Sequence, residues 1–356
     1  MADLLPMLAL FAAAVAWFLL PLLPALRELL RPTDLAALKV VDRSSGYVAY
    51  FARNFRNYLE KQTALLPAEQ QVGDFLGRLP DGTRLVRIHK AVTTLEREGK
   101  DGPEKRLVVV DVPLRLEGGE TFLMELYARA PLTGGPEAVY RAVYAEKDLT
   151  LGEGSTVLRW AHAGGRLAVG RDSVLRGRIS SDTGVELGPG VVFERIGAPI
   201  ISAGNHGLFE PPPPPPAPPP AWRLPDGATR VGDHVRIAGD LAIPPGLRVA
   251  ATLVVAGRLT IGLGTIVEGS VKAHGDIVLE DEVQVSSAVV TRTRLVVGRG
   301  AWIGGPAIAE TSIRLRRGAL VGGPELPATL SAPVVELESG AAVYGQISAP
   351  NGAWTL

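Results

Sequence analysis

The chain has 356 residues, with 37 Lys plus Arg against 37 Asp plus Glu and no cysteine. The balanced charge gives no reason to expect nucleic-acid binding, and the absence of thiols excludes a disulfide framework, a cysteine zinc site and a thiol nucleophile. Aromatic residues make up only 6% of the chain, so any core must be built from Val, Ile, Leu and Ala.

The N-terminus carries an apolar stretch, Leu4–Leu26, that contains no charged residue. A bilayer core is spanned by about 20 such residues in a helix. The sequence therefore predicts a transmembrane anchor in residues 1–32 of a single-pass inner (cytoplasmic) membrane protein. Lys and Arg residues after the stretch favour a cytoplasmic location for the rest. The alternative is a buried helix of a soluble domain. The anchor residues would include Leu4, Leu10, Trp17, Leu20 and Leu26.

Residues 33–130 are predicted to form a helical segment and a mixed α/β region. Residues 33–70 have an apolar stripe at helical spacing that includes Tyr50, Phe55 and Leu59. This helix could lie on the membrane, pair with another helix or, as we prefer, cap a neighbouring fold. Turn signals such as Pro80-Asp81-Gly82 and strand-like runs occupy residues 71–130.

From about residue 131 the chain becomes periodic, with blocks of 18 residues that divide into three sixes. In each six, position 1 is mostly a large apolar residue and position 5 is apolar or small, and of these positions only Glu325 is charged. Positions 5 and 1 are two residues apart and therefore point to the same face of a strand. The pattern predicts a mainly β fold, a triangular single-stranded β-helix (β-solenoid) with three sides in each rung. About ten rungs are expected. The predicted core includes Leu151, Val169, Leu187, Ile261, Leu279, Val285, Val297 and Leu315.

Two features of the composition fit this fold. Glycines such as Gly152 and Gly170 follow position 1, where a corner must be tight. Few aromatic residues are expected in a narrow bore. A slip of four residues precedes the last block, which begins at Val335.

Residues 203–222 interrupt the periodicity with the run PPPPPPAPPP at 211–220. We interpret this Pro-rich insertion as an excursion between rungs of one stack, and the alternative is a link between two separate solenoids. The predicted organisation is thus first rungs in 131–202, the insertion in 203–222, and remaining rungs with a C-terminal cap in 223–356.

The chain offers little that resembles a catalytic constellation. Of its five histidines, His162, His234 and His274 fall at outward positions of the repeat, isolated from one another. No metalloprotease, nucleophile-elbow or phosphate-loop motif occurs. We predict no catalytic, cofactor or metal site.

The repeat, in phrases such as LTIGLGTIVEGSVKAHGDIVLEDEVQV at 259–285, resembles the bactofilins, bacterial polymer-forming cytoskeletal proteins. The resemblance covers roughly residues 149–352. It implies a right-handed triangular β-helix that polymerises end to end without nucleotide; the hexads alone also suit the left-handed form. The Pro-rich insertion and the extra region at 71–130 depart from that family.

We therefore expect a membrane-anchored scaffold that associates with itself, with membrane lipid and with envelope or cell-wall proteins, and that organises cell-shape machinery. An open last rung presents unpaired backbone groups that invite another chain. Val343, Ile347, Ala349 and Trp354 are the candidates to cap this end or form a polymer joint. The alternatives are a hexapeptide-repeat acyltransferase, which shares the same hexad, and an outward-facing stalk or adhesin.

Overall fold

The structure of the chain is a computed structural model that describes residues 48–71, 73–90, 102–204, 211–213 and 219–356, together with positions 10, 11, 15, 17, 19 and 20. The chain divides into two compact units, Met1–Asp42 and Arg43–Leu356. All of the strands among the described residues lie in the second unit, in one hydrogen-bonded stack of about 14 turns. The β-solenoid prediction is confirmed, with more turns than the ten expected.

The prediction of a membrane-spanning helix, and with it the single-pass inner-membrane location, is corrected by the structure. Among the residues that the structure describes, no helix is long and apolar enough to cross a bilayer, which takes about 20 successive apolar residues. Leu10, Trp17 and Leu20 are exposed single positions in the described part of this region. Leu4 and Leu26 lie outside the described residues.

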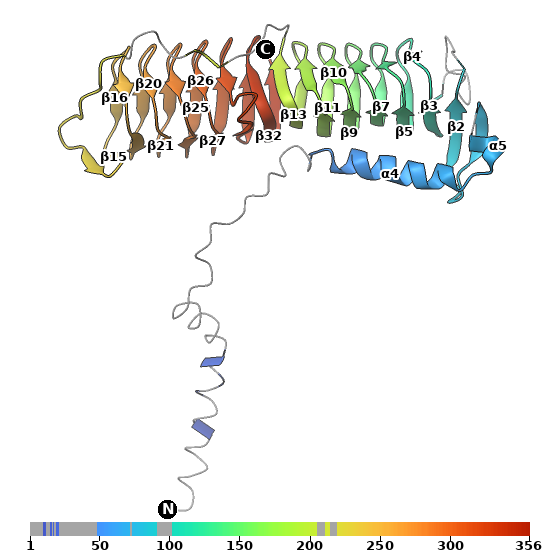
Figure 1. Ribbon diagram of the computed structural model, residues 1–356, viewed down its shortest axis with the longest axis horizontal. Coiled ribbons are helices and arrows are strands. Elements are labelled where there is room, and N and C mark those ends of the chain that lie inside the picture. Colours follow the sequence, from blue (N-terminus) through green and yellow to red (C-terminus); the bar gives the residue numbers. More distant parts are fainter. Residues whose placement is uncertain are drawn as a thin grey trace, which may run out of the picture. The chain divides into compact units, whose positions relative to one another are not determined.

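The solenoid consists of two segments (Figure 1). The first segment, residues 84–203, starts with strand β2 (Arg84–Ile88), which pairs in parallel with the next strand along the chain. Parallel pairing then continues turn by turn to β13, mostly with a register of 17 or 18 residues, as from Leu149 to Leu167. Its other strands are β3 (Leu107–Val110), β4 (Leu114–Arg115), β5 (Thr121–Ala128), β6 (Leu132–Thr133), β7 (Val139–Ala145), β8 (Leu149–Leu151), β9 (Thr156–Ala163), β10 (Arg166–Val169), β11 (Val174–Ser181), β12 (Gly184–Leu187) and β13 (Val192–Ala203).

The second segment, residues 229–355, has three short strands in each turn. Its first row contains β15 (His234–Ile237), β18 (Thr252–Val255), β21 (Val271–Ala273), β24 (Val289–Thr291), β27 (Ala307–Ala309) and β30 (Ala328–Ser331). Its second row contains β16 (Leu241–Ile243), β19 (Leu259–Ile261), β22 (Ile277–Leu279), β25 (Arg294–Val297), β28 (Ser312–Leu315) and β31 (Val334–Leu337). Its third row contains β17 (Arg248–Val249), β20 (Ile266–Val267), β23 (Gln284–Val285), β26 (Trp302–Ile303) and β29 (Leu320–Val321).

The register within the second segment follows the predicted repeat. Ile261 pairs with Leu279, and Leu279 with Val297, at intervals of 18 residues. The interval from Leu315 to Leu337 is 22 residues, which is the four-residue slip. The slip is accommodated by an exposed loop, so Glu325 lies outside the core rather than at an inward position.

The core is one continuous cluster that runs through both segments. All eight predicted core residues are buried, from Val285 at 0% exposed to Val169 at 4%. The expectation that rings would not fit was wrong for the first segment, where Phe122 and Tyr140 stack with ring centroids 5.5 Å apart. Corner glycines are needed because successive turns touch there: a Cβ on Gly152 would lie 2.2 Å from the carbonyl oxygen of Gly135.

An antiparallel strand adjoins each outer end of the stack. Beside β2 lies an antiparallel hairpin partner, β1 (Phe75–Arg78), and Pro80-Asp81-Gly82 forms the predicted turn between them. In the next turn Glu104 occupies a bore position opposite Phe122 and is fully buried with Arg106, whose guanidinium binds both carboxylate oxygens at 2.6 and 2.7 Å. At the far end of the second segment, β14 (Thr229–Val231) pairs antiparallel with β15, and Trp222 packs on the core.

Helix α4 (Tyr50–Ala64) lies along the side of the first segment rather than across its end, and the short helix α5 (Ala68–Gln71) follows it (Figure 1). Of the predicted stripe, Leu59 is buried and Phe55 is half-buried, whereas Tyr50 is exposed. Residues 33–47 lie outside the described part of the chain. Because β3 and β5 belong to the parallel stack, the solenoid begins before residue 131.

Candidate functional site

The two segments meet in the middle of the stack through their last turns (Figure 1). Strand β32 (Ala342–Thr355) closes the second segment, and it pairs antiparallel with β13, which closes the first. The chain therefore runs toward this place in both segments, from opposite ends. We call the pairing of β13 with β32 the joint.

The four residues predicted to cap the C-terminal end or form a polymer joint all lie in β32. Val343 is the register partner of Ile201, Ile347 of Ile196, and Trp354 of Val192. Val343, Ile347 and Ala349 are fully buried. These side chains therefore join two parts of one chain, and the C-terminal turn is not an open end.

Hydrogen bonds cross the joint on more than one side of the triangle. The Ala203 amide donates to the Ala341 carbonyl at 3.0 Å, and the Gly340 amide donates to the Ala203 carbonyl at 2.7 Å. The Thr355 hydroxyl accepts from the Val191 amide at 2.9 Å and donates to the Gly188 carbonyl at 2.6 Å. The joint thus pairs backbone groups that an open last turn would leave unpaired.

The sequence around the joint is nearly duplicated, a signal that lies outside the 18-residue repeat. Residues 187–199 read LGPGVVFERIGAP and residues 337–350 read LESGAAVYGQISAP. The equivalent isoleucines of the two stretches, Ile196 and Ile347, face each other across the joint. A pairing in which a residue meets its own counterpart is the mark of a local two-fold arrangement.

The Pro-rich insertion is explained by this reversal. It connects Ala203, at the joint, to Ala221, which bridges to Arg248 in the first full turn of the second segment. It is therefore neither an excursion between neighbouring rungs nor a link between separate solenoids. The strands on its two sides belong to one stack, but their turns succeed one another in opposite directions.

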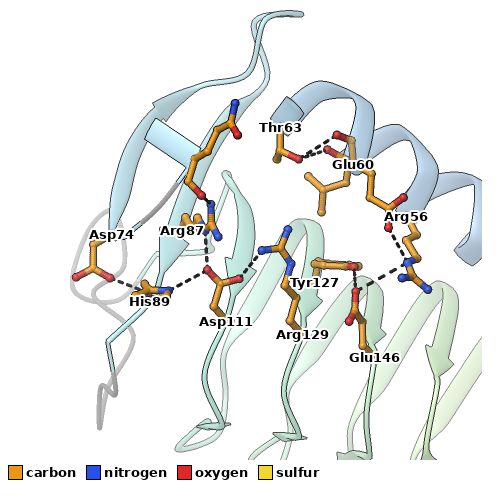
Figure 2. A network of polar contacts seen from close by, with 12 residues as sticks. Arg56, Glu60, Thr63, Asp74, Arg87, His89, Asp111, Tyr127, Arg129 and Glu146 are labelled. Atoms are coloured by element: carbon orange, nitrogen blue, oxygen red, sulfur yellow. Dashed lines mark hydrogen bonds and ion pairs between the residues drawn. The ribbon is translucent and has the colours of Figure 1, made fainter. Parts of the chain in front are cut away.

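A second candidate site is a polar cluster beside the start of the first segment, between β2, β3, β5 and α4 (Figure 2). Asp111 is almost buried and accepts hydrogen bonds from the Arg87 Nε at 2.6 Å and the Arg129 Nη1 at 3.1 Å. His89 Nδ1 lies 3.4 Å from the same carboxylate. Asp74 accepts the backbone amides of His89 and Lys90, which holds the pKa of its carboxyl below the usual value.

A cavity of about 240 Å³ adjoins this cluster and is lined by Glu60, Thr63, Ala64, Gln71, Arg87 and Arg129. Both guanidinium groups at its wall already bind Asp111, and Arg87 also donates to the Gln71 carbonyl. Asp111 thus binds an arginine on the turn before it and an arginine on the turn after it. The cluster's chemistry is that of a structural clamp.

His162 is the third candidate, because Ser180 and Asp182 complete a serine–histidine–aspartate set around it. Its Nδ1 lies 2.8 Å from the Ser180 hydroxyl and its Nε2 lies 3.8 Å from Asp182. Burial lowers the pKa of His162 to about 4, against the opposing effect of Asp182, so the ring is neutral at pH 7. Ser180 is only 2% exposed, so a substrate could not reach this hydroxyl.

His162 lies at an outward position of the repeat, as predicted, but it is buried there. It points outward from the bore, but it continues a ladder in which Tyr127, Tyr144 and His162 stack on successive turns, with centroids 5.1 and 4.9 Å apart. Helix α4 covers this strip, and Phe55 contacts Tyr127 and Trp160. His234 and His274 are exposed, and His206 lies outside the described residues.

Comparisons with known proteins give no family for the chain: no family model, no curated protein and no solved structure matches it. Within the residues that the structure describes, no group of three or more His, Asp or Glu side chains is placed to hold a metal ion. The joint is the site with the most extensive and specific geometry.

Proposed function

We propose that this protein is a bactofilin-like structural scaffold that associates with copies of itself and holds cell-envelope proteins at fixed spacings. The observation that carries the proposal is the joint, which fuses two opposed solenoid segments into one hydrogen-bonded stack. About 14 turns at about 4.8 Å each give a stack of about 67 Å. A stack with one continuous dry core resists bending and suits a spacer.

The structure changes the way in which such a scaffold would assemble. The last turn of each segment is occupied at the joint, and each outer end carries an antiparallel strand. Simple addition of chains to an open C-terminal rung is therefore not part of the proposal. Assembly requires the sides of the stack or a rearrangement at the joint.

The proposal is tested by sedimentation velocity and electron microscopy of the purified full chain over a wide range of concentrations. We expect rods about 67 Å long and species of higher mass that increase with concentration. A chain that stays strictly monomeric at every concentration would contradict a self-associating scaffold.

The acyltransferase alternative is distinguished from the scaffold by substituting two exposed histidines, His234→Gln and His274→Gln, in one chain. A scaffold keeps its sedimentation profile and its cellular partners after this change. Loss of an acyl-transfer activity that the unmodified chain possesses would favour the enzyme instead.

A further inference from the structure

We propose that the joint is an exchangeable interface whose second occupant is another copy of this chain. The inference rests on the scaffold proposal and names the surface through which self-association occurs. In the closed chain, β13 pairs with β32 of the same molecule. In the exchanged form, β13 of one copy pairs with β32 of another, through the same hydrogen bonds and the same core contacts.

The self-complementary character of the joint carries the first step. Ile196 and Ile347 are equivalent in the duplicated sequence and face each other, and Arg195 faces Ser348. Nothing in these contacts requires the two strands to belong to one chain. Exchange of an identical element between copies is an inexpensive route to oligomers, because every contact of the closed form is regained.

The second step concerns the length of the chain between the two segments. The closed form is possible because this connection is long enough to span the second segment. Gly204 lies beside Ser339, Pro211 lies beside Gly323, and the Pro220 carbonyl accepts from the Arg248 amide at 2.9 Å. The described residues of the connection thus lie beside the last turn of the second segment, at Gly204 and Pro211, and beside its first full turn, at Pro220.

The distance to be covered is set by the stack. Between Arg248 and Ala342 on the same row lie five steps, through Ile266, Gln284, Trp302 and Leu320. Five steps at about 4.8 Å are about 24 Å. The 16 residue steps from Gly204 to Pro220 would span about 50 Å in a polyproline conformation, so the connection is long enough for the closed form.

Shortening the connection makes the closed form impossible. Deletion of residues 205–216 leaves Ala217 and Pro218–Pro220 after Gly204. Four residue steps span at most about 14 Å, which is less than the 24 Å required. The last turn of the second segment can then meet only the β13 of another copy.

The experiment uses the full chain, which contains no cysteine of its own. Arg195→Cys and Ser348→Cys place two thiols on register partners across the joint, where facing Cβ atoms lie about 4.5–5.5 Å apart. With the natural connection we expect an oxidised chain of monomer mass. With residues 205–216 deleted, we expect disulfide-linked species of twice the mass or more.

The matched control replaces residues 205–216 with a Gly/Ser sequence of the same length. It keeps the reach and should give the monomeric disulfide. If the shortened chain is folded and stays monomeric, with or without the disulfide, the exchange inference is overturned.

A second measurement serves if the shortened chain does not fold. Two full-length chains with different tags, one carrying Arg195→Cys and the other Ser348→Cys, are refolded together at high concentration. A disulfide that joins the two differently tagged chains supports exchange, and the absence of this disulfide overturns it. Concentration-dependent assembly of the natural chain without this disulfide would leave the scaffold proposal standing and remove only the exchange. If the refolded variants exchange but the natural chain does not assemble at any concentration, the exchange inference stands and the scaffold proposal is removed.

Discussion

At the scale of single residues, direction relative to the bore decides what each side chain does. Val285 lies between Val267 and Ile303 of the neighbouring turns and is fully buried. Its neighbour Gln284 belongs to the same two-residue strand but points outward and is half-buried. Alternation along a strand makes these adjacent positions very different environments.

Val285→Asp should therefore destabilise the second segment strongly, on the order of 4 kcal/mol, because an unpaired carboxylate enters a dry bore. Gln284→Asp is the matched control and should cost little. Urea denaturation followed by circular dichroism measures both variants. Equal midpoints for the two would contradict the inward assignment of Val285.

His162 gives a prediction about pH. Its pKa is about 4 in the folded chain and about 6.5 when unfolded, so the unfolded chain binds more protons between these values. The free energy of unfolding should fall as pH decreases from about 6.5 to 4, by about 3 kcal/mol in total. Above pH 6.5 the effect is fully absent.

Comparison with His162→Gln isolates this effect from the carboxylates, since all other groups are shared. Asp182, Arg53 and Arg56 are the charged groups that face the ring. The variant should have a flatter stability profile between pH 4 and 6.5, while His274→Gln, at an exposed histidine, should follow the natural chain. Parallel profiles for the natural chain and His162→Gln would refute the prediction.

At the scale of elements, α4 shows how a solenoid side is covered. The strip beneath it contains Tyr127, Tyr144 and Trp160, which are large outward residues on successive turns. Arg53 and Arg56 of the helix extend over the strip toward Asp182 and Glu146. Such exposed ion pairs contribute little, so the buried face of α4 supplies most of its attachment.

Leu59→Asp should release α4 from the strip, because Leu59 is fully buried beneath the helix. The expected loss is about 2–4 kcal/mol for this contact, with the stack itself retained. Asn57→Asp, at an exposed position of the same helix, is the matched control. Limited proteolysis within residues 50–64 and hydrogen exchange of β5, β7 and β9 should increase only in Leu59→Asp; equal protection in both variants would contradict the role given to this face.

At the scale of the whole stack, the joint couples two segments that the chain builds from opposite ends. In repeat architectures stability is a sum of terms within turns and between neighbouring turns. Between the two segments, the interface between neighbouring turns is the joint, where β13 pairs with β32. Its loss should divide one cooperative unit into two.

Ile347→Asp should produce this division, because it places a charge in the bore opposite Ile196. Thermal unfolding should change from one transition to two. Ser348→Asp, which faces Arg195, keeps the bore apolar and should preserve a single transition. A single transition in Ile347→Asp at an unchanged temperature would show that the joint does not couple the segments.

The 18-residue period, the inward positions and the four-residue slip could be predicted from the sequence, because each follows from which residue types recur at fixed spacing along the chain. The eight core residues were predicted in the same way, and the turn at Pro80-Asp81-Gly82 was predicted from its local turn residues. The predicted N-terminal span was wrong: among the described residues no helix is long and apolar enough to cross a bilayer. The cover over His162 was missed because outward residues carry no signal of what will lie on them.

The sequence by itself determined that this chain winds into a solenoid and which side chains fill its bore. Only the tertiary structure decided which turn lies next to which. An apolar hexad fits equally well above or below any other hexad, so the repeat contains no information about stacking order across residues 203–222. The reversal depends on long-range pairing of two terminal strands and on a connection long enough to permit it, and both are properties of the folded stack.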